Sequence, residues 1–291
     1  MFLELGGGGL RALHAYHGVV EALDEHDPQW RRSLQGCAGV SAGALACLTI
    51  VVGTTAETRK RLLDDYGFDS KADLALLVSS FAVTDGTSLK RIIAAVLASG
   101  GLSAESTLSD LERLLRIRFV CVATDLVSKQ VVYLQASTFP RMRVLDAVYA
   151  SCAMPLLFPP FRCGEHLFVD GNALTTMPDV FSEGRVMKIV VNRFSGKSED
   201  IATLPDYVQS LVHLLMMRGD PQTALRLPVD GLGRHQLFVE EDDATSLRRV
   251  GYAYTLDALH GGRVHPFVVK ATLLLARLMV IYSSPSQCDA E

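Results

Sequence analysis

The sequence predicts an α/β protein with a central, mostly parallel sheet covered by helices in three layers. Two glycine turns, at residues 6–9 and 39–43, carry this prediction because each follows a short apolar strand and precedes a helix. The resulting β-α-β-α order is typical of parallel sheets with helices packed on them. With 291 residues, 49% of them hydrophobic, the chain is long enough to bury a large core.

The first two strands and helices follow directly from the apolar pattern. Residues 2–5 form the first expected strand and lead straight into the first glycine turn. From residue 13 to about 27, apolar side chains recur every three or four positions, which predicts an amphipathic helix. A second strand is expected near residues 35–38, and a very apolar helix at 44–53.

Residues 54–116 are expected to form a helical excursion beside the sheet, because no strand pattern interrupts them. Its helices are expected at 62–66, 74–81, 89–97 and 107–115. The remaining expected elements are strands at 117–124, 131–134, 167–169, 187–191 and 235–239, and helices at 144–151, 204–217 and 247–259.

The apolar stretch at residues 264–282 is expected to be a terminal helix packed on the core. Pro266, Lys270 and Arg277 interrupt it, and its longest uncharged run is far below the roughly 20 residues of a membrane-spanning helix. Lys270 and Arg277 are seven positions apart and share one helix face. A helix lying in a lipid interface is therefore the alternative.

Charge and cysteine usage restrict the partners and the compartment. The 28 basic and 32 acidic residues give a net charge of −4, without the basic stripe that nucleic-acid binding requires. The six cysteines form no C-x-x-C pair, which favours buried free thiols in a reducing compartment. Because a strand begins at residue 2, no signal-peptide pattern is present, and an intracellular, cytoplasmic location is expected.

Ser41 is the candidate nucleophile. It lies at the centre of a G-x-S-x-G motif with Gly39 and Gly43, at an expected strand-to-helix turn. Flanking glycines allow the close backbone approach that such a turn needs, and the serine hydroxyl is pushed out of the sheet edge. The motif alone is a weak signal, but a glycine loop occupies the equivalent place on the neighbouring strand.

That glycine loop is the candidate oxyanion hole. Gly7, Gly8 and Gly9 precede a helix, so their N–H groups and the helix dipole are suited to a developing negative charge. Gly7, Gly9 and Ala12 also satisfy a dinucleotide-binding fingerprint. A dinucleotide-binding module is less favoured, because residues 39–41 replace the acidic residue expected at the end of the second strand.

Asp170 is the candidate base for Ser41. A serine protease or an α/β-hydrolase would use a histidine, but none of the eight histidines lies in a turn that plainly follows a strand. Asp170 ends a short buried strand and precedes Gly171. An aspartate acting alone must be held against the hydroxyl and be partly desolvated, which raises its basicity. An ordinary Asp-Gly turn is the alternative.

Together these motifs resemble the patatin-like phospholipases. Gly7-Gly8-Gly9-Leu10-Arg11, the serine turn and Asp170-Gly171 occur in that family's order and spacing. The stretches at 150–155, 158–160 and 168–171 resemble the approach to the family's catalytic aspartate, and weaker similarity at 122–126 and 251–252 extends the match to roughly residues 2–260.

The resemblance implies a patatin-like α/β/α acyl hydrolase domain over residues 1–260, followed by an apolar helix and short tail at 261–291. It implies that Ser41 is the nucleophile and Asp170 the base, and that the N–H groups of the loop from Gly7 to Leu10 stabilise the oxyanion. The implied reaction is hydrolysis of a lipid acyl ester through an acyl-enzyme, without metal or cofactor. A membrane or lipid-droplet surface is the implied setting.

Three positions next to these motifs leave alternatives open. Arg11 is expected to position the glycine loop or meet a lipid phosphate, or else to be an ordinary surface residue. Ala12 replaces the family's usual glycine, and Asn172 replaces a small residue after Gly171. Asn172 is expected to affect the pocket or the hydrogen bonding of Asp170, so a weak or inactive lipid-binding protein of the same fold is the alternative to an enzyme.

Overall fold

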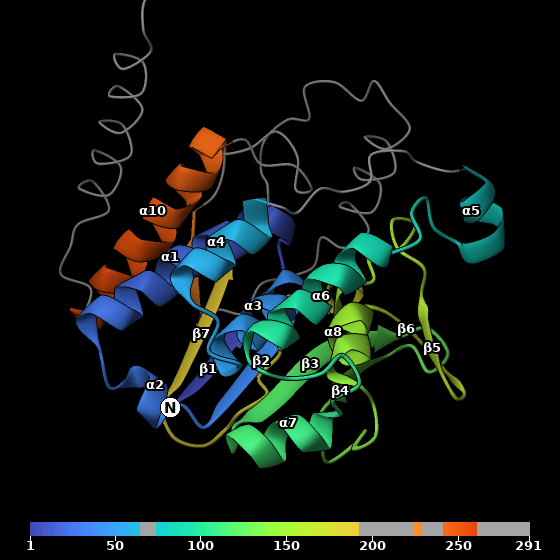
Figure 1. Ribbon diagram of the computed structural model, residues 1–291, viewed down its shortest axis with the longest axis horizontal. Coiled ribbons are helices and arrows are strands. Elements are labelled where there is room, and N and C mark those ends of the chain that lie inside the picture. The colour runs from blue at the N-terminus through green and yellow to red at the C-terminus, as the bar shows by residue number, and fades with distance from the viewer. Residues whose placement is uncertain (65–73, 192–223, 229–240, 261–291) are drawn as a thin grey trace, which may run out of the picture.

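The computed structural model describes residues 1–64, 74–191, 224–228 and 241–260 (Figure 1). Its strands are β1 (Phe2–Leu5), β2 (Gly36–Val40), β3 (Arg118–Asp125), β4 (Gln130–Leu134), β5 (Phe161–Cys163), β6 (His166–Asp170), β7 (Val186–Val191) and β8 (Leu225–Leu227). Its helices are α1 (Gly9–His26), α2 (Trp30–Ser33), α3 (Ala42–Val51), α4 (Ala56–Asp64), α5 (Leu74–Ser80), α6 (Thr87–Ser99), α7 (Leu108–Leu115), α8 (Val144–Cys152) and α10 (Glu241–Leu259), with the 3-10 turn η1 (Gly171–Ala173).

The strands form one sheet in the order β5-β6-β3-β2-β1-β7-β8, with β4 paired to β3. The pairings among β3, β2, β1, β7 and β8 are parallel, whereas β4, β5 and β6 pair antiparallel. The predicted α/β class, with a central, mostly parallel sheet flanked by helices, is confirmed.

Most expected elements occur, and the differences have local causes. Helix α1 begins at Gly9, before its first periodic apolar residue, because the end of the glycine run already forms the first helical turn. The strands β5 and β8 and the helix α2 were not expected, since segments of three or four residues are too short for a recognisable period. The helix expected at 204–217, the strand at 235–239, the end of 62–66 and the stretch at 264–282 lie outside the described residues.

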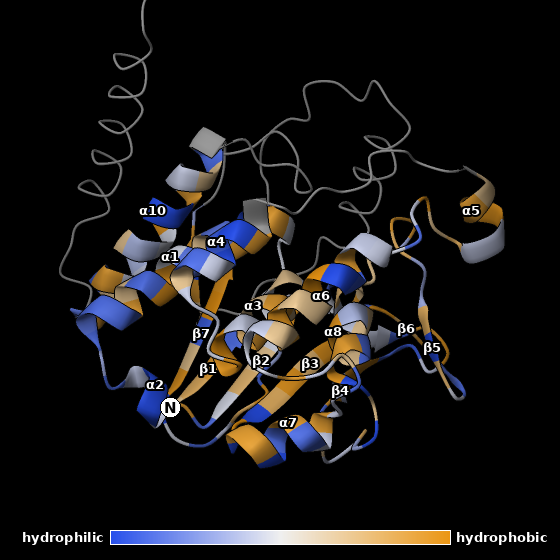
Figure 2. Cartoon of the chain, viewed as in Figure 1, coloured by the Kyte–Doolittle hydropathy of each residue, from blue (hydrophilic) through white to orange (hydrophobic). Residues whose placement is uncertain are grey.

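Helices α3 and α8 pack on one face of the sheet, and α1 and α6 lie next to them on the same side (Figure 1). The apolar helix α3 lies against β1, β2 and β3, and Figure 2 shows its hydrophobic colouring beside the hydrophilic outer helix α4. Helix α1 lies between α3 and α10. A Cβ atom on Gly18 would lie 1.8 Å from the carbonyl oxygen of Arg248, so this glycine permits the close crossing of α1 and α10. Within the described ranges no helix is long and apolar enough to cross a membrane.

The opposite face is packed by the segment that follows η1. The Phe2 ring contacts the ring of Phe181 there, and apolar side chains of the neighbouring strands belong to the same cluster. Glu4 is fully buried on this face, where its Oε1 accepts the N–H groups of Val180 and Phe181 at 2.9 Å each and its Oε2 lies 3.0 Å from Nζ of Lys188. A charged residue in an otherwise apolar strand therefore attaches the covering segment to the sheet.

Candidate active site

Ser41 occupies a tight turn between β2 and α3. Its φ of 55° and ψ of −124° are unusual for a residue with a side chain and store backbone strain. A Cβ atom on Gly39 would lie 2.3 Å from the backbone N of Ala44, and one on Gly43 would lie 2.1 Å from the carbonyl oxygen of Leu5. Both flanking glycines are therefore required, because backbone occupies the space of any side chain.

Ser151 holds the backbone of this turn. The N–H of Ser41 donates to Oγ of Ser151 at 3.0 Å, and the Ser151 hydroxyl donates to the carbonyl oxygen of Val122 at 2.6 Å. The Ser41 N–H is thus occupied and is not an oxyanion donor. The sequence does not predict this bond, because its partners come from α8, β3 and the serine turn, which lie far apart in the chain.

The strand register brings Ser41 and Asp170 together. Strand β3 pairs with β2 as far as Val122, which lies opposite Val40, and with β6 from Ala123, which lies opposite Asp170. Since β4 pairs with these same residues of β3 along its other edge, β2 and β6 must share one edge, end to end. Ser41 follows the last residue of β2 and Asp170 is the last of β6, so both lie at the junction.

The Asp170 carboxylate is fully buried and only partly hydrogen-bonded. Its Oδ1 accepts the N–H of Asn172 at 2.8 Å, whereas Oδ2 has no hydrogen bond of standard geometry within the described part of the chain. Burial raises the pKa of Asp170 to about 7, against the opposing effects of the Ser41 hydroxyl and the Asn172 N–H. A looser contact between Ser41 and the carboxylate is usual before a substrate is bound. At neutral pH this group can both accept and return a proton.

No histidine lines the pocket at Ser41 in the part of the chain that the structure describes. His166 forms an acid–histidine pair with Asp125, with 3.0 Å between Nδ1 and Oδ2. It precedes Asp170 by four residues in β6, which places its backbone about 13 Å along the extended strand. This pair therefore lies away from the junction.

The glycine loop lies beside the serine turn, and Gly7 and Gly8 in it have no room for side chains. Gly8 and Gly9 have φ values of 147° and 63°, and a Cβ atom on Gly8 would lie 2.4 Å from Cγ2 of Val191. Tyr16 fixes the loop by donating its hydroxyl to the carbonyl oxygen of Gly6 at 2.7 Å. Because α1 begins at Gly9, the first N–H groups of this helix, including that of Leu10, have no acceptor within the helix.

The structure shows where Asn172 and Arg11 lie, which the sequence left open. A Cβ atom on Gly7 would lie 1.8 Å from Nδ2 of Asn172, so the Asn172 amide packs directly on the glycine loop. The residue after Gly171 therefore connects the aspartate turn to the proposed oxyanion loop. Arg11 is only 3% exposed, so its interpretation as an ordinary surface residue is wrong.

An apolar pocket opens at Ser41. The space among its lining residues measures about 390 Å³ with the open solvent that it includes. The pocket is lined by Gly9, Leu10, Leu13, Ser41, Ala42, Leu45, Leu89, Cys152, Met154 and Phe158. Burial and the nearby Asp170 carboxylate raise the pKa of Cys152, so its thiol stays protonated at neutral pH. Within the described ranges no three acidic, histidine or cysteine side chains gather as metal ligands would.

Replacing Gly8 by alanine is expected to lower turnover by about 10²- to 10³-fold, the scale for losing one oxyanion donor. The new methyl group meets Val191, so the loop must shift its N–H groups. Gly101→Ala is the matched control, because Gly101 also has a positive φ, but a Cβ atom there would have no neighbour within 4 Å among the described residues. Ester hydrolysis and thermal melting of both variants check the prediction. Near-normal turnover of folded Gly8→Ala would contradict it.

Comparison with known proteins identifies the family and fold relatives of this chain. The family model described as patatin-like phospholipase matches residues 3–178. Uncharacterized NTE family proteins of Mycobacterium bovis and Mycobacterium tuberculosis are 28% identical over 213 residues, which cover 71% of this chain and 33% of those proteins. The chain thus spans about a third of the length of these relatives.

Solved structures resemble this fold over most of the chain. VipD from Legionella pneumophila superimposes with a TM-score of 0.62 at 15% identity, covering 90% of this chain and 67% of that one. The type III effector protein ExoU gives a TM-score of 0.53 at 17% identity, covering 91% and 53%. These likenesses concern the fold. Since the family model spans more than half of the residues, the chain belongs to the patatin-like phospholipase family.

Proposed function

We propose that this protein hydrolyses the acyl esters of lipids with a Ser41–Asp170 dyad. The observation that carries the proposal is the junction of β2 and β6, where a buried carboxylate with an unpaired oxygen lies at a strained serine turn. The raised pKa of Asp170 supports its role as base, because a general base works best when its pKa lies near the working pH.

In the proposed mechanism, Ser41 Oγ attacks the ester carbonyl carbon while its proton passes to Oδ2 of Asp170. The carbonyl oxygen becomes an oxyanion, stabilised by N–H groups of the loop from Gly7 to Leu10 and by that of Ala42, which follows the nucleophile. Collapse of this intermediate breaks the ester C–O bond, and the alcohol leaves with the proton from Asp170. Water then hydrolyses the acyl-enzyme by the same route in reverse order.

The pocket supports a lipid as the acyl donor. Apart from Ser41, its side chains are apolar, so an aliphatic acyl chain can be buried there without unpaired polar groups. The family to which the chain belongs is named for phospholipids, which supports a phospholipid or related ester as the substrate class.

A lipid surface is the proposed place of action. Val78 on α5 and Phe81 just after it are 85% and 64% exposed, which is high for large apolar side chains. The next residue, Ala82, pairs with Leu156 beside the pocket residues Met154 and Phe158. Exposed apolar side chains in a segment that leads to the pocket residues are suited to contact with an acyl boundary.

Incubation of the full chain with a panel of ester lipids tests the function. The panel contains diacyl phospholipids, lysophospholipids, triacylglycerol and a short-chain chromogenic ester, and released fatty acid is quantified by mass spectrometry. Release from at least one long-chain ester, lost in Ser41→Ala, is the expected result. Lipid binding without any release would favour the inactive lipid-binding alternative, and release unchanged in Ser41→Ala would overturn the dyad.

A further inference from the structure

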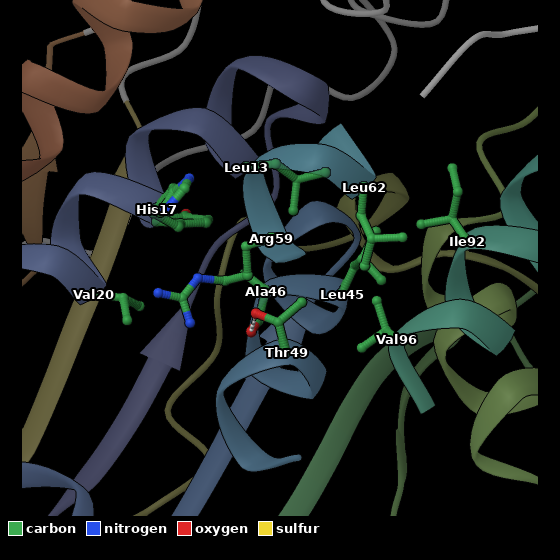
Figure 3. A pocket seen from close by; sticks show the side chains of 11 residues that line it. Leu13, His17, Val20, Leu45, Ala46, Thr49, Arg59, Leu62, Ile92 and Val96 are labelled. Atoms are coloured by element: carbon green, nitrogen blue, oxygen red, sulfur yellow. Dashed lines mark hydrogen bonds between the residues drawn. The ribbon is translucent and has the colours of Figure 1, made fainter. Parts of the chain in front are cut away.

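A second cavity lies beside the pocket at Ser41, between α1, α3, α4 and α6 (Figure 3). The space among its lining residues measures about 480 Å³ with the open solvent that it includes, and the cavity shares Leu13 and Leu45 with the first pocket. Two leucine side chains therefore line both spaces. Leu62, Ile92 and Val96 make the far wall of the second cavity apolar as well.

Arg59 brings a charged group into this apolar space. Its side chain enters from α4 and is only 5% exposed, and Figure 3 shows its guanidinium group among the lining residues. Nη1 donates to the carbonyl oxygen of Thr54 at 2.5 Å, which fixes the orientation of the group. Nε and Nη2 are shielded from solvent and have no hydrogen-bond partner among the residues that the structure describes. These two atoms form one edge of the guanidinium, and their parallel N–H bonds match the two oxygens of a carboxylate.

The nearby acids do not neutralise Arg59 by contact. Glu21 and Asp24 favour its charged form from a distance, but neither forms an ion pair with it in the described part of the chain. The Asp24 carboxylate is already bound by Arg31, with 2.7 Å between Nε and Oδ1. A buried charge without a partner is costly, and an anionic ligand would remove that cost.

The cavity offers one positive charge. Burial lowers the pKa of Arg59 to about 10, so the guanidinium is still protonated at neutral pH. His17 lines the same cavity, and burial together with the charge of Arg59 lowers its pKa to about 3. His17 is therefore neutral. A single negative charge on the ligand is matched, whereas the second charge of a phosphate monoester dianion would find no positive partner among the described residues that line the cavity.

We propose that this second cavity binds a fatty-acid anion, with its carboxylate on Nε and Nη2 of Arg59 and its chain along Leu13, Leu45 and the apolar far wall. The preference for a fatty acid over other single-chain carboxylates rests on the proposed function, because hydrolysis at Ser41 would release a fatty acid next to the cavity. The cavity is thus a site for the reaction product or for the same compound taken from solution.

Binding of dodecanoate to the full-length Ser41→Ala protein tests the proposal, measured by isothermal titration calorimetry at pH 8 below the micelle concentration. Dodecanoate is expected to bind this cavity, and Arg59→Met is expected to weaken that binding by about 10- to 100-fold, the scale of a charge-assisted hydrogen-bonded pair. Arg61→Met is the matched control, because Arg61 lies exposed on the same helix. It is expected to leave the affinity unchanged.

Two further ligands and one further variant decide between the remaining outcomes. Dodecanol should bind without dependence on Arg59, and dodecyl phosphate should bind more weakly than dodecanoate; tighter binding of the phosphate would overturn the choice of carboxylate. Ile92→Trp narrows the cavity while leaving the guanidinium in place, and it should also weaken the binding of dodecanoate. This variant keeps the test valid if Arg59→Met does not fold. Unchanged dodecanoate affinity in Arg59→Met or Ile92→Trp would overturn the site.

This binding experiment requires neither turnover nor Ser41. Absence of lipid hydrolysis would therefore leave it fully measurable, and loss of the fatty-acid site would leave hydrolysis and labelling of Ser41 unaffected. Failure of this proposal and failure of the proposed function are distinguishable for that reason.

Discussion

Replacing Ser41 by alanine is expected to lower turnover of the best ester substrate by on the order of 10⁴-fold or more, because the variant lacks the atom that attacks the carbonyl. The fold is expected to persist, since the turn is held by the backbone N–H of residue 41 and the hydroxyl of Ser151. A fluorophosphonate probe should label the wild-type chain at Ser41 and should not label the variant. Turnover, together with mass spectrometry of the labelled peptide, checks both statements.

Cys152→Ala is the matched control for this labelling. Cys152 lines the same pocket, but burial raises the pKa of its thiol, so it is not expected to react. Labelling should therefore persist in Cys152→Ala. Labelling that survives unchanged in Ser41→Ala would show that another residue is the nucleophile, and the proposed dyad would fail.

Replacing Asp170 by asparagine is expected to lower turnover by on the order of 10³-fold or more. The amide has nearly the same shape and can still accept the N–H of Asn172, but it cannot take the proton of Ser41. Single replacements of His166 and His260, and of His213 and His235, which lie outside the described residues, should leave most activity. A histidine variant that matches the loss of Asp170→Asn would replace the dyad by a triad.

The pH dependence of the wild type should report the same carboxylate. Because Asp170 must be ionised to act as base and its pKa is raised to about 7, kcat/KM is expected to rise with pH through about 7 and to level off above it. The pKa of a carboxyl in the unfolded chain is about 4, so the folded state holds the extra proton between these values. Asp170 therefore contributes stability below about pH 4, and that contribution is lost as the pH rises through about 7.

Asp170→Asn should consequently melt at a higher temperature than the wild type at pH 8, where the buried carboxylate is ionised. An inactive variant with raised Tm would place the defect in the chemistry and exclude unfolding. A flat profile of kcat/KM between pH 5.5 and 8 would contradict Asp170 as the titrating base.

The sequence by itself determined the features that local geometry requires. Strand β1, the glycine loop, α1, β2, the serine turn and α3 follow one another within residues 2–51, and each leaves a short-range pattern of apolar spacing or glycine. Gly39 and Gly43 are visible in the sequence as part of the motif around Ser41. Only glycine fits at these two positions, because backbone atoms fill the space that a side chain would need. The order of these motifs also sufficed to identify the family.

Only the tertiary structure decided how these pieces meet. Asp170 lies at the serine turn because β6 pairs with β3 along the same edge as β2, starting where the pairing with β2 ends. Which edge a strand pairs with depends on contacts between residues that are far apart in the chain. The bond from Ser41 to Ser151 and the contact of Asn172 with Gly7 join distant segments in the same way. Arg59 looks like an ordinary charged residue of an exposed helix until packing of α4 buries it. Burial and strand partners arise from long-range packing, so no local pattern encodes them.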